Sequence, residues 1–279
     1  MHRPFNCCLA LLLAAAFATP AAADHSWNNY HWARTSNPFT LLVVDSVTSE
    51  WQDPFDVSLT LWSESEVLDN SVNSIAEDSR TRKRCQMVSG QIRVCNAAYG
   101  QNGWLGLATI YIDSNGHITQ GTTKVNDSYG WYFAAYPSER NHVMCQEIGH
   151  LYGLGHTSED GSSQSTCMDY SMTVGSQWPN AHDYEQLASI YTHTDSYNSY
   201  AASGGGGGSD GGGGGCNAPA GKGCNKNEAP DGVPPGAVRV FFRPGSHGTL
   251  GHADFVLPDN EGGLWVFHAT LLPDDAERR

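Results

Sequence analysis

The stretch CQEIGHLYGLGH, residues 145–156, joins the end of a predicted helix to a glycine-rich turn. Residues 138–151, SERNHVMCQEIGHL, contain no proline and carry apolar side chains at helical spacing. Ser138 is of the residue type that caps helix N-termini, because its hydroxyl accepts a hydrogen bond from a free backbone N–H group. We therefore expect a helix that begins near Ser138 and ends just before the turn.

The side chains of this stretch are spaced as a metal site requires. Residues four apart lie on one helix face, about 6 Å from each other, so Gln146 and His150 point toward one position. Glu147 lies about 100° around the helix axis, which suits contact with water rather than with the metal. Gly153 permits the chain to reverse and bring back His156 as a third ligand. Zinc held by three protein groups keeps its fourth position for water, as catalytic zinc requires.

These residues resemble a family signature. The pattern Q-E-x-x-H-x-x-G-x-x-H is similar to the metzincin motif H-E-x-x-H-x-x-G-x-x-H, with Gln146 in place of the first histidine. In CMDYS, Met168 stands where metzincins have the methionine of the Met-turn, and Tyr170 follows two residues on. The resemblance covers residues 30–191. It is to secreted bacterial matrixin-like zinc peptidases.

The resemblance implies an α/β (α+β) fold, with a twisted mixed sheet, an active-site helix, a Met-turn and a C-terminal helix. It implies a zinc endopeptidase in which Glu147 is the general base for a metal-activated water and Tyr170 steadies the oxyanion. The strand of residues 104–112, WLGLATIYI, matches by position the strand that pairs with extended substrate in metzincins. The implied zinc ligands and the structural residues at the site are Gln146, His150, His156, Gly153 and Met168.

Gln146 leaves two interpretations of activity open. Zinc prefers imidazole, thiolate or carboxylate to a neutral amide oxygen, so this substitution weakens metal binding. The presence of Glu147 favours a working enzyme, because burying an acidic side chain beside a metal pocket is costly and does not improve the packing of the core. The competing interpretation is a catalytically impaired scaffold that serves as a secreted binding or adhesion protein.

The first residues indicate export. Residues 1–23 combine a short basic start, an apolar run and an A-x-A boundary, which is typical of a cleaved signal peptide. We expect a secreted, extracellular protein, with the periplasm as the alternative. Removal of Cys7 and Cys8 leaves six of the eight cysteines, an even number that favours disulfides in an oxidising compartment. Neighbour pairing is the simplest scheme, although others stay open: Cys85 with Cys95, Cys145 with Cys167, and Cys216 with Cys224.

A glycine-rich segment divides the rest of the chain. Residues 204–215, GGGGGSDGGGGG, supply no side chains for a core, so we interpret residues 201–215 as a flexible linker. Residues 24–200 before it are long enough for one hydrophobic core and would form the metallopeptidase domain. Residues 216–279 would form a small β-rich tail of unknown function, in which AVRVFFR and GLWVFHATL are predicted strands.

Other elements of the main domain follow from local patterns. FTLLVV, residues 39–44, is predicted as a strand, and residues 47–62 have loosely helical spacing despite a proline. CQMVSGQIRVC, residues 85–95, is predicted as a disulfide-closed hairpin. The strands of residues 104–112 and 117–125 should form a hairpin, because the Asn-Gly that joins them favours a tight turn. A last helix is expected near residues 181–192.

Charge and composition restrict the partners. The formal net charge of −14, from 29 acidic and 15 basic residues, argues against nucleic-acid binding. After the signal, no apolar run is long enough to span a membrane. We expect a monomer that acts on protein or peptide substrates.

Four further histidines have simpler interpretations than metal binding. His142 is expected on the helix surface, and His182 with Asp183 at the start of the last helix in a local hydrogen-bond network. His247 and His252, in HGTLGH, have no neighbouring cluster of metal-binding residues in the sequence.

Overall fold

The computed structural model describes residues 25–200, 232–246, 248–274 and 276. The predicted signal peptide, the glycine-rich linker, the Cys216–Cys224 pair and His247 lie outside the described residues. In chain order the elements are β1 His31–Trp32, β2 Phe39–Ser46, α1 Gln52–Trp62, β3 Leu68–Ser74, α2 Ser79–Arg84, β4 Gln91–Ala97, β5 Trp104–Ile112, β6 His117–Asn126, η1 Asp127–Tyr129, α3 Gly130–Ala135, α4 Pro137–His150, η2 Val174–Gln177, α5 Ala181–Ile190, β7 Val238–Arg243, β8 Gly251–Pro258 and β9 Leu264–Leu271.

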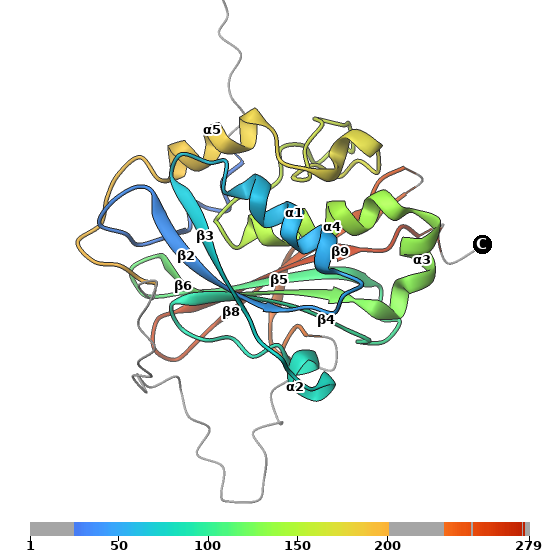
Figure 1. Cartoon of the computed structure of the whole chain (residues 1–279), viewed down its shortest axis with the longest axis horizontal. Helices are drawn as coiled ribbons and strands as arrows, with labels where there is room; N and C mark the ends of the chain where they lie inside the picture. Colours follow the sequence, from blue (N-terminus) through green and yellow to red (C-terminus); the bar gives the residue numbers. More distant parts are fainter. Residues whose placement is uncertain (1–24, 201–231, 247, 275, 277–279) are drawn as a thin grey trace, which may run out of the picture.

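One mixed sheet runs through the molecule in the order β3-β2-β4-β6-β5-β9-β8-β7, with β1 paired to β6. The first half is parallel, since β2 pairs with β3 and β4, and β4 with β6, in the same direction. From β5 onward the pairs are antiparallel. Helices α1, α3, α4 and α5 lie on one side of the sheet, and α2 lies on the other (Figure 1). The mixed α/β class expected from the sequence is confirmed.

The C-terminal strands are part of this same sheet. Residues 264–271 of β9 pair antiparallel with β5 along nearly its whole length. Strand β8 then pairs with β9, and β7 with β8. Both strands expected in the tail are present, but they extend the main sheet instead of forming a β element of their own. Two segments that the glycine-rich stretch separates in sequence are therefore neighbours in space.

The long helix of the site begins one residue earlier than expected. It spans Pro137–His150, with Tyr136 at the N-cap position and without a side-chain cap, so the predicted Ser138 cap is wrong. Proline suits the first helical position because its fixed φ is helical and its missing N–H would have no helical partner. Helix α1 begins at Gln52, so Pro54 lies in its first turn, where proline is tolerated.

Two expectations about the strands have opposite outcomes. The hairpin of β5 and β6 is confirmed, with Gly116 at a φ of 87° in the turn between them. The hairpin expected for residues 85–95 is wrong, because Cys85 follows helix α2 and only Gln91–Ala97 forms a strand there. That strand, β4, finds its partners in β2 and β6, so the Cys85–Cys95 disulfide fastens the end of α2 to the sheet.

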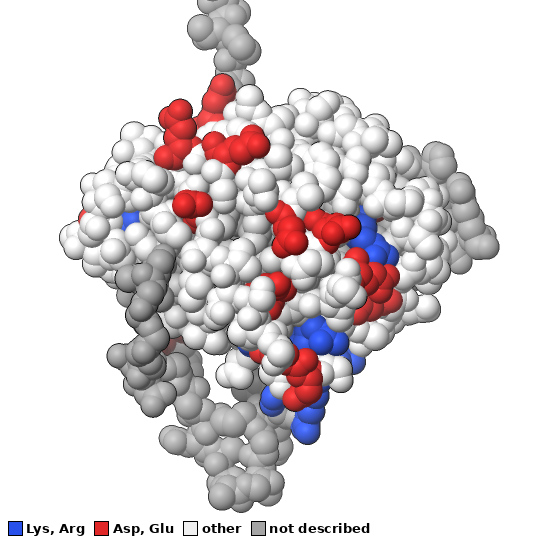
Figure 2. All heavy atoms as spheres, viewed as in Figure 1, with Lys and Arg blue, Asp and Glu red and all other residues white. Residues whose placement is uncertain are grey.

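The surface agrees with the acidic composition. Acidic side chains are spread over the face in Figure 2, and the largest group of basic side chains there gathers at the lower edge, where Figure 1 places α2. The last turn of α2 carries Arg82, Lys83 and Arg84. None of the helices in the described ranges is long and apolar enough to cross a membrane.

Candidate metal centre

Helix α4 carries the first half of the site into the protein interior. Gln146, Glu147 and His150 are all buried, against the sheet on one side and the segment around Met168 on the other. Packing is tight at this point: a Cβ on Gly149 would lie 2.6 Å from the Met168 sulfur. Met168 therefore packs against the helix at Gly149, the residue before His150.

The turn after α4 brings the second histidine back. Gly153 has a φ of 92°, and a Cβ there would lie 2.0 Å from the Tyr30 carbonyl oxygen, so only glycine fits. His150 Nδ1 lies 2.8 Å from the Leu154 carbonyl oxygen and must donate to it, which leaves the lone pair on Nε2. The rings of His150 and His156 come within 4.8 Å of each other, centroid to centroid. The expected approach of these two histidines is confirmed.

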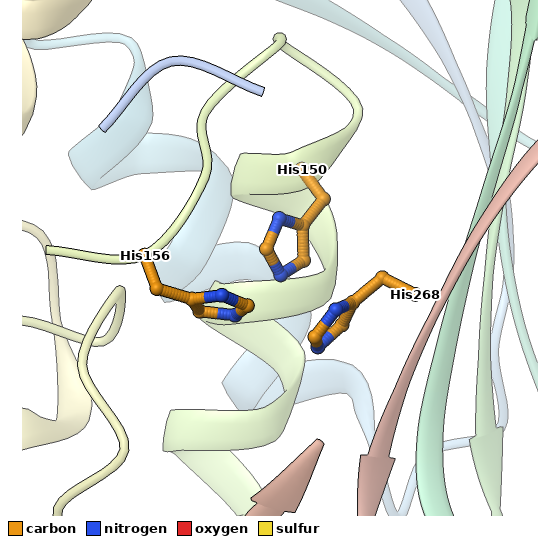
Figure 3. Close-up of side chains that lie close together, drawn as sticks. All are labelled: His150, His156 and His268. Carbon is orange, nitrogen blue, oxygen red and sulfur yellow. The ribbon is translucent and has the colours of Figure 1, made fainter. Parts of the chain in front are cut away.

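A third histidine comes from the C-terminal strand β9. His150, His156 and His268 each offer a ring nitrogen, and these atoms all lie within 4.8 Å of one another. Figure 3 shows the three rings converging from the end of α4, from the turn after it and from the sheet. No pattern in the sequence pointed to His268. Its local signal was an isolated histidine in an apolar strand, and only the β5–β9 pairing brings it here.

A carboxylate orients His268. Asp254 is its cross-strand partner on β8, and its Oδ1 accepts a hydrogen bond of 2.7 Å from His268 Nδ1. In the neutral ring that bond keeps the proton on Nδ1 and leaves the lone pair on Nε2. A carboxylate behind a ligating imidazole is a recurrent arrangement in zinc sites.

His252 also belongs to this cluster. Its Nδ1 lies 3.1 Å from His268 Nε2, and its ring stacks on Tyr170 at 3.7 Å between centroids. His252 was expected to lie apart from any cluster of metal-binding residues, and the structure corrects this, because β8 places it beside the site. The Tyr170 hydroxyl lies 3.2 Å from His156 Nδ1, so the tyrosine expected near the metal does adjoin a candidate ligand.

Both the oxygen and the nitrogen of the Gln146 side-chain amide make hydrogen bonds within the protein. Its Oε1 accepts a hydrogen bond of 2.8 Å from the Thr270 hydroxyl on β9. Its Nε2 donates to the Asp169 carbonyl oxygen at 3.1 Å. Gln146 thus ties α4 both to β9 and to the segment after Met168. Its role as a metal ligand stays a prediction.

Glu147 lies beside the histidines with an unusual protonation equilibrium. Burial raises the pKa of its carboxyl to about 7, although His268 and the polar groups of Thr270 oppose this rise. Within the described residues its oxygens make no hydrogen bond of ordinary geometry. Gly106 on β5 makes room for it, because a Cβ there would lie 2.6 Å from Glu147 Oε1.

The electrostatics of the histidines suit a cation. Burial holds the pKa of His150 and of His156 well below the ordinary value, so both rings are neutral. Their Nε2 atoms are buried and have no hydrogen-bond partner among the described residues. The pKa of His268 is instead raised, because Asp254 and Glu147 together outweigh the lowering effect of burial, so a metal would have to displace a proton from this ring. Buried lone pairs without partners are costly, and a bound metal ion would satisfy them.

Access to the site is narrow. A cavity of about 170 Å³ reaches His150 and His156 and is also lined by the segment His25–Trp27, Gly155, Glu159 and Asp254. Pockets that enclose a drug-sized ligand are usually roughly 300–1,000 Å³. Strand β5 is paired on both sides, with β6 and with β9, so substrate cannot add to it as metzincins would suggest. The expectation of substrate pairing at β5 is corrected.

The disulfide expected beside the site is present. Cys145 on α4 is bonded to Cys167, which adjoins Met168, and the Cys85–Cys95 pair is confirmed as well. The bond fixes the helix relative to the Met168 segment.

Two other residues singled out in the sequence, His142 and Asp183, make contacts that stabilise the fold. His142 is fully buried, with Nε2 3.2 Å from the Asp169 carbonyl oxygen and Nδ1 3.3 Å from a Glu139 oxygen. Its predicted place on the helix surface is wrong, because the Met168 segment covers that face. Asp183 accepts from the Asn180 backbone in a capping box at the start of α5, as expected.

Comparison with protein-family models and with curated proteins found no match to this chain.

Proposed function

We propose that the chain is a secreted zinc-dependent endopeptidase whose metal is held by His150, His156 and His268. The observation that carries this proposal is the convergence of three imidazoles, two of them buried (His150 and His268) and one partly buried (His156), beside the buried carboxylate of Glu147. Three nitrogen ligands with one position left for water are the usual composition of a catalytic zinc site. The spacing of the helix residues and the position of Met168 support the same reaction class, through the resemblance to metzincins.

In this proposal His268 takes the place of the histidine that Gln146 replaces. Thr270 bonds to Gln146 two residues further along β9, so the same strand that supplies the imidazole is fastened to α4. Gln146 then positions the strand, and Asp254 holds the ring of His268 in the tautomer with the lone pair on Nε2, an atom that a metal would take from its 3.1 Å contact with His252 Nδ1. An imidazole is also a better zinc ligand than an amide oxygen.

The chemistry is divided between the metal and the chain. Zinc, when bound there, polarises a peptide carbonyl and lowers the pKa of water. Glu147 takes the proton that the attacking water loses and returns it to the leaving amine. A base with a pKa near the working pH is suited to both transfers. The Tyr170 hydroxyl, beside His156, is the candidate donor to the oxyanion.

The substrate must enter by the cavity, since β5 has no free edge. Trp27 and Glu159 line this entrance, so an extended polypeptide would have to displace part of the wall to reach Glu147. This narrow access supports the second candidate function. A binding or adhesion protein on a metzincin-like scaffold needs only a stable core around the histidines, and no passage through which a polypeptide could reach them.

A proteolysis assay distinguishes the two functions. We expect the purified mature chain to cleave an unfolded protein such as reduced casein, and to stop when zinc is chelated. Glu147→Gln should reduce turnover by roughly 100-fold or more, the usual contribution of a general base, while zinc content stays the same. Glu185→Gln, an exposed substitution on α5, is the matched control and should keep full activity.

Equal turnover in Glu147→Gln and wild type would assign the activity to a contaminating protease. Absence of cleavage with zinc fully bound would favour the binding protein.

A further inference from the structure

A second group of histidines, separate from the candidate zinc ligands, comes from β1, from β6 and from the segment after α5. His31 on β1 pairs directly with His117, the first residue of β6, in the parallel register. His193 and Asp195 come from the segment that follows α5. These residues are partly buried, apart from His193, whose side chain is 55% exposed.

The donor atoms of this group are close to one another. His31 Nε2 lies 3.2 Å from His193 Nε2 and 3.7 Å from Asp195 Oδ2. Asp195 Oδ1 lies 3.4 Å from His117 Nε2 and 3.6 Å from His193 Nε2. Zinc–nitrogen bonds of about 2.0–2.1 Å in a tetrahedron place neighbouring ligand atoms about 3.3 Å apart. These four separations are near that value, and the donor atoms of His31, His117 and Asp195 all lie within 4.8 Å of one another, whereas the exposed ring of His193 would have to turn further inward to complete the set.

Hydrogen bonds on the outer side of two rings fix their tautomers. His31 Nδ1 lies 2.9 Å from the Asn29 carbonyl oxygen, which can only accept, so Nδ1 carries the proton. His117 Nδ1 lies 2.7 Å from the Tyr197 hydroxyl, whose own proton goes to Asp113 at 3.0 Å. In their neutral forms, both rings therefore present the Nε2 lone pair to the group.

The two carboxylate oxygens of Asp195 face different partners. Its Oδ2 accepts from the backbone N–H and from the guanidinium of Arg34, each at 3.1 Å. Its Oδ1 faces His117 and His193. Arg34 thus holds the carboxylate in place and competes for one oxygen only, which leaves Oδ1 to act as a single-oxygen ligand.

We propose that His31, His117, His193 and Asp195 form a second, structural zinc site. Three imidazoles and one carboxylate suit zinc rather than magnesium or calcium, which prefer oxygen ligands. Four protein ligands leave no position for substrate, so the site is structural. It would fasten β1, near the start of the described chain, to β6 and to the segment after α5. Burial lowers the pKa of His31, which agrees with a neutral ligand.

The alternative is a metal-free cluster in which His193 Nε2 carries the proton of the ring and donates it to its neighbours. Zinc content separates the two. We expect native mass spectrometry of the mature chain, dialysed against excess zinc and then buffer, to find two zinc ions. His193→Ala and His117→Ala should each leave one ion, with casein cleavage retained. His193→Ala is the safer variant, since its exposed ring contributes little to packing.

His182→Ala is the matched control, because His182 is partly exposed and lies in another group, with His25 and Asp183. It should keep two ions. His268→Ala should lose the other ion and activity but keep this one, so failure of the active-site proposal is recognised separately. A single ion in wild type that His268→Ala removes would overturn the second site. Two ions retained in both His117→Ala and His193→Ala, or loss of an ion in His182→Ala, would overturn it as well.

Discussion

Replacing Glu147 with glutamine should stabilise the metal-free protein at and above neutral pH. Burial raises the pKa of this carboxyl from 4.5 to about 7 in the folded state. Below about pH 4.5 the group is protonated in the folded and the unfolded chain alike. As the pH rises toward 7, the unfolded chain loses this proton first, so the unfolding free energy falls.

The size of the effect follows from that shift. One pH unit is worth about 1.4 kcal/mol, so a rise from 4.5 to about 7 corresponds to roughly 3 kcal/mol, fully lost above about pH 7. Glutamine resembles the protonated acid and does not titrate. We therefore expect Glu147→Gln to match wild type near pH 4.5 and to exceed it by roughly 3 kcal/mol at pH 8.

Urea denaturation of both proteins at pH 4.5, 6 and 8, with a chelator present, measures this difference. The chelator matters because a bound cation would lower the pKa of Glu147. Subtracting wild type from variant removes the contributions of other titrating groups, such as His268. The exposed substitution Glu185→Gln should show no such dependence on pH. A constant difference between Glu147→Gln and wild type at all three pH values would refute the placement of a buried, protonated carboxyl beside the histidines.

Two further substitutions test the construction of the site. Gly106→Ala should displace the Glu147 carboxylate, because the new Cβ would lie 2.6 Å from Glu147 Oε1, and turnover should fall at least tenfold with zinc retained. Gly130→Ala is the control, because its Cβ meets nothing within 4 Å, and it should have no effect. Equal turnover in the two variants would contradict this prediction. The double variant Cys145→Ser/Cys167→Ser removes a disulfide that closes a loop of sequence separation 22, so its free energy of unfolding in urea should fall by roughly 3 kcal/mol. An unchanged urea midpoint would contradict a stabilising role for this disulfide.

Local patterns predicted the half of the site that lies within a short stretch of chain. The helical spacing predicted Gln146 and His150 on one face of α4 with Glu147 next to them, and Gly153 indicated the turn that returns His156, because both effects depend on neighbouring residues. The Asn-Gly turn likewise predicted the β5–β6 hairpin. Each of these features is decided by the backbone preferences of a few consecutive residues.

The rest depends on contacts between distant segments. His268 enters the site only because β9 pairs with β5, and an apolar strand carries no sign of which edge it will join. The same reason explains the wrong hairpin at residues 85–95, since β4 has the pattern of a strand but finds parallel partners elsewhere. His142 was placed on a surface because helical spacing does not reveal that the Met168 segment covers that face.

The zinc affinity of two alanine variants tests the central claim most directly. Competition of the metal-loaded chain with a chromophoric chelator gives the dissociation constant of the active-site ion. If His268 is the third ligand, His268→Ala should lose that ion altogether, whereas Gln146→Ala should weaken it by about 10–100-fold, as expected for a residue that positions a ligand without touching the metal. Loss of the ion in Gln146→Ala with unchanged affinity in His268→Ala would contradict the account and make the amide the ligand.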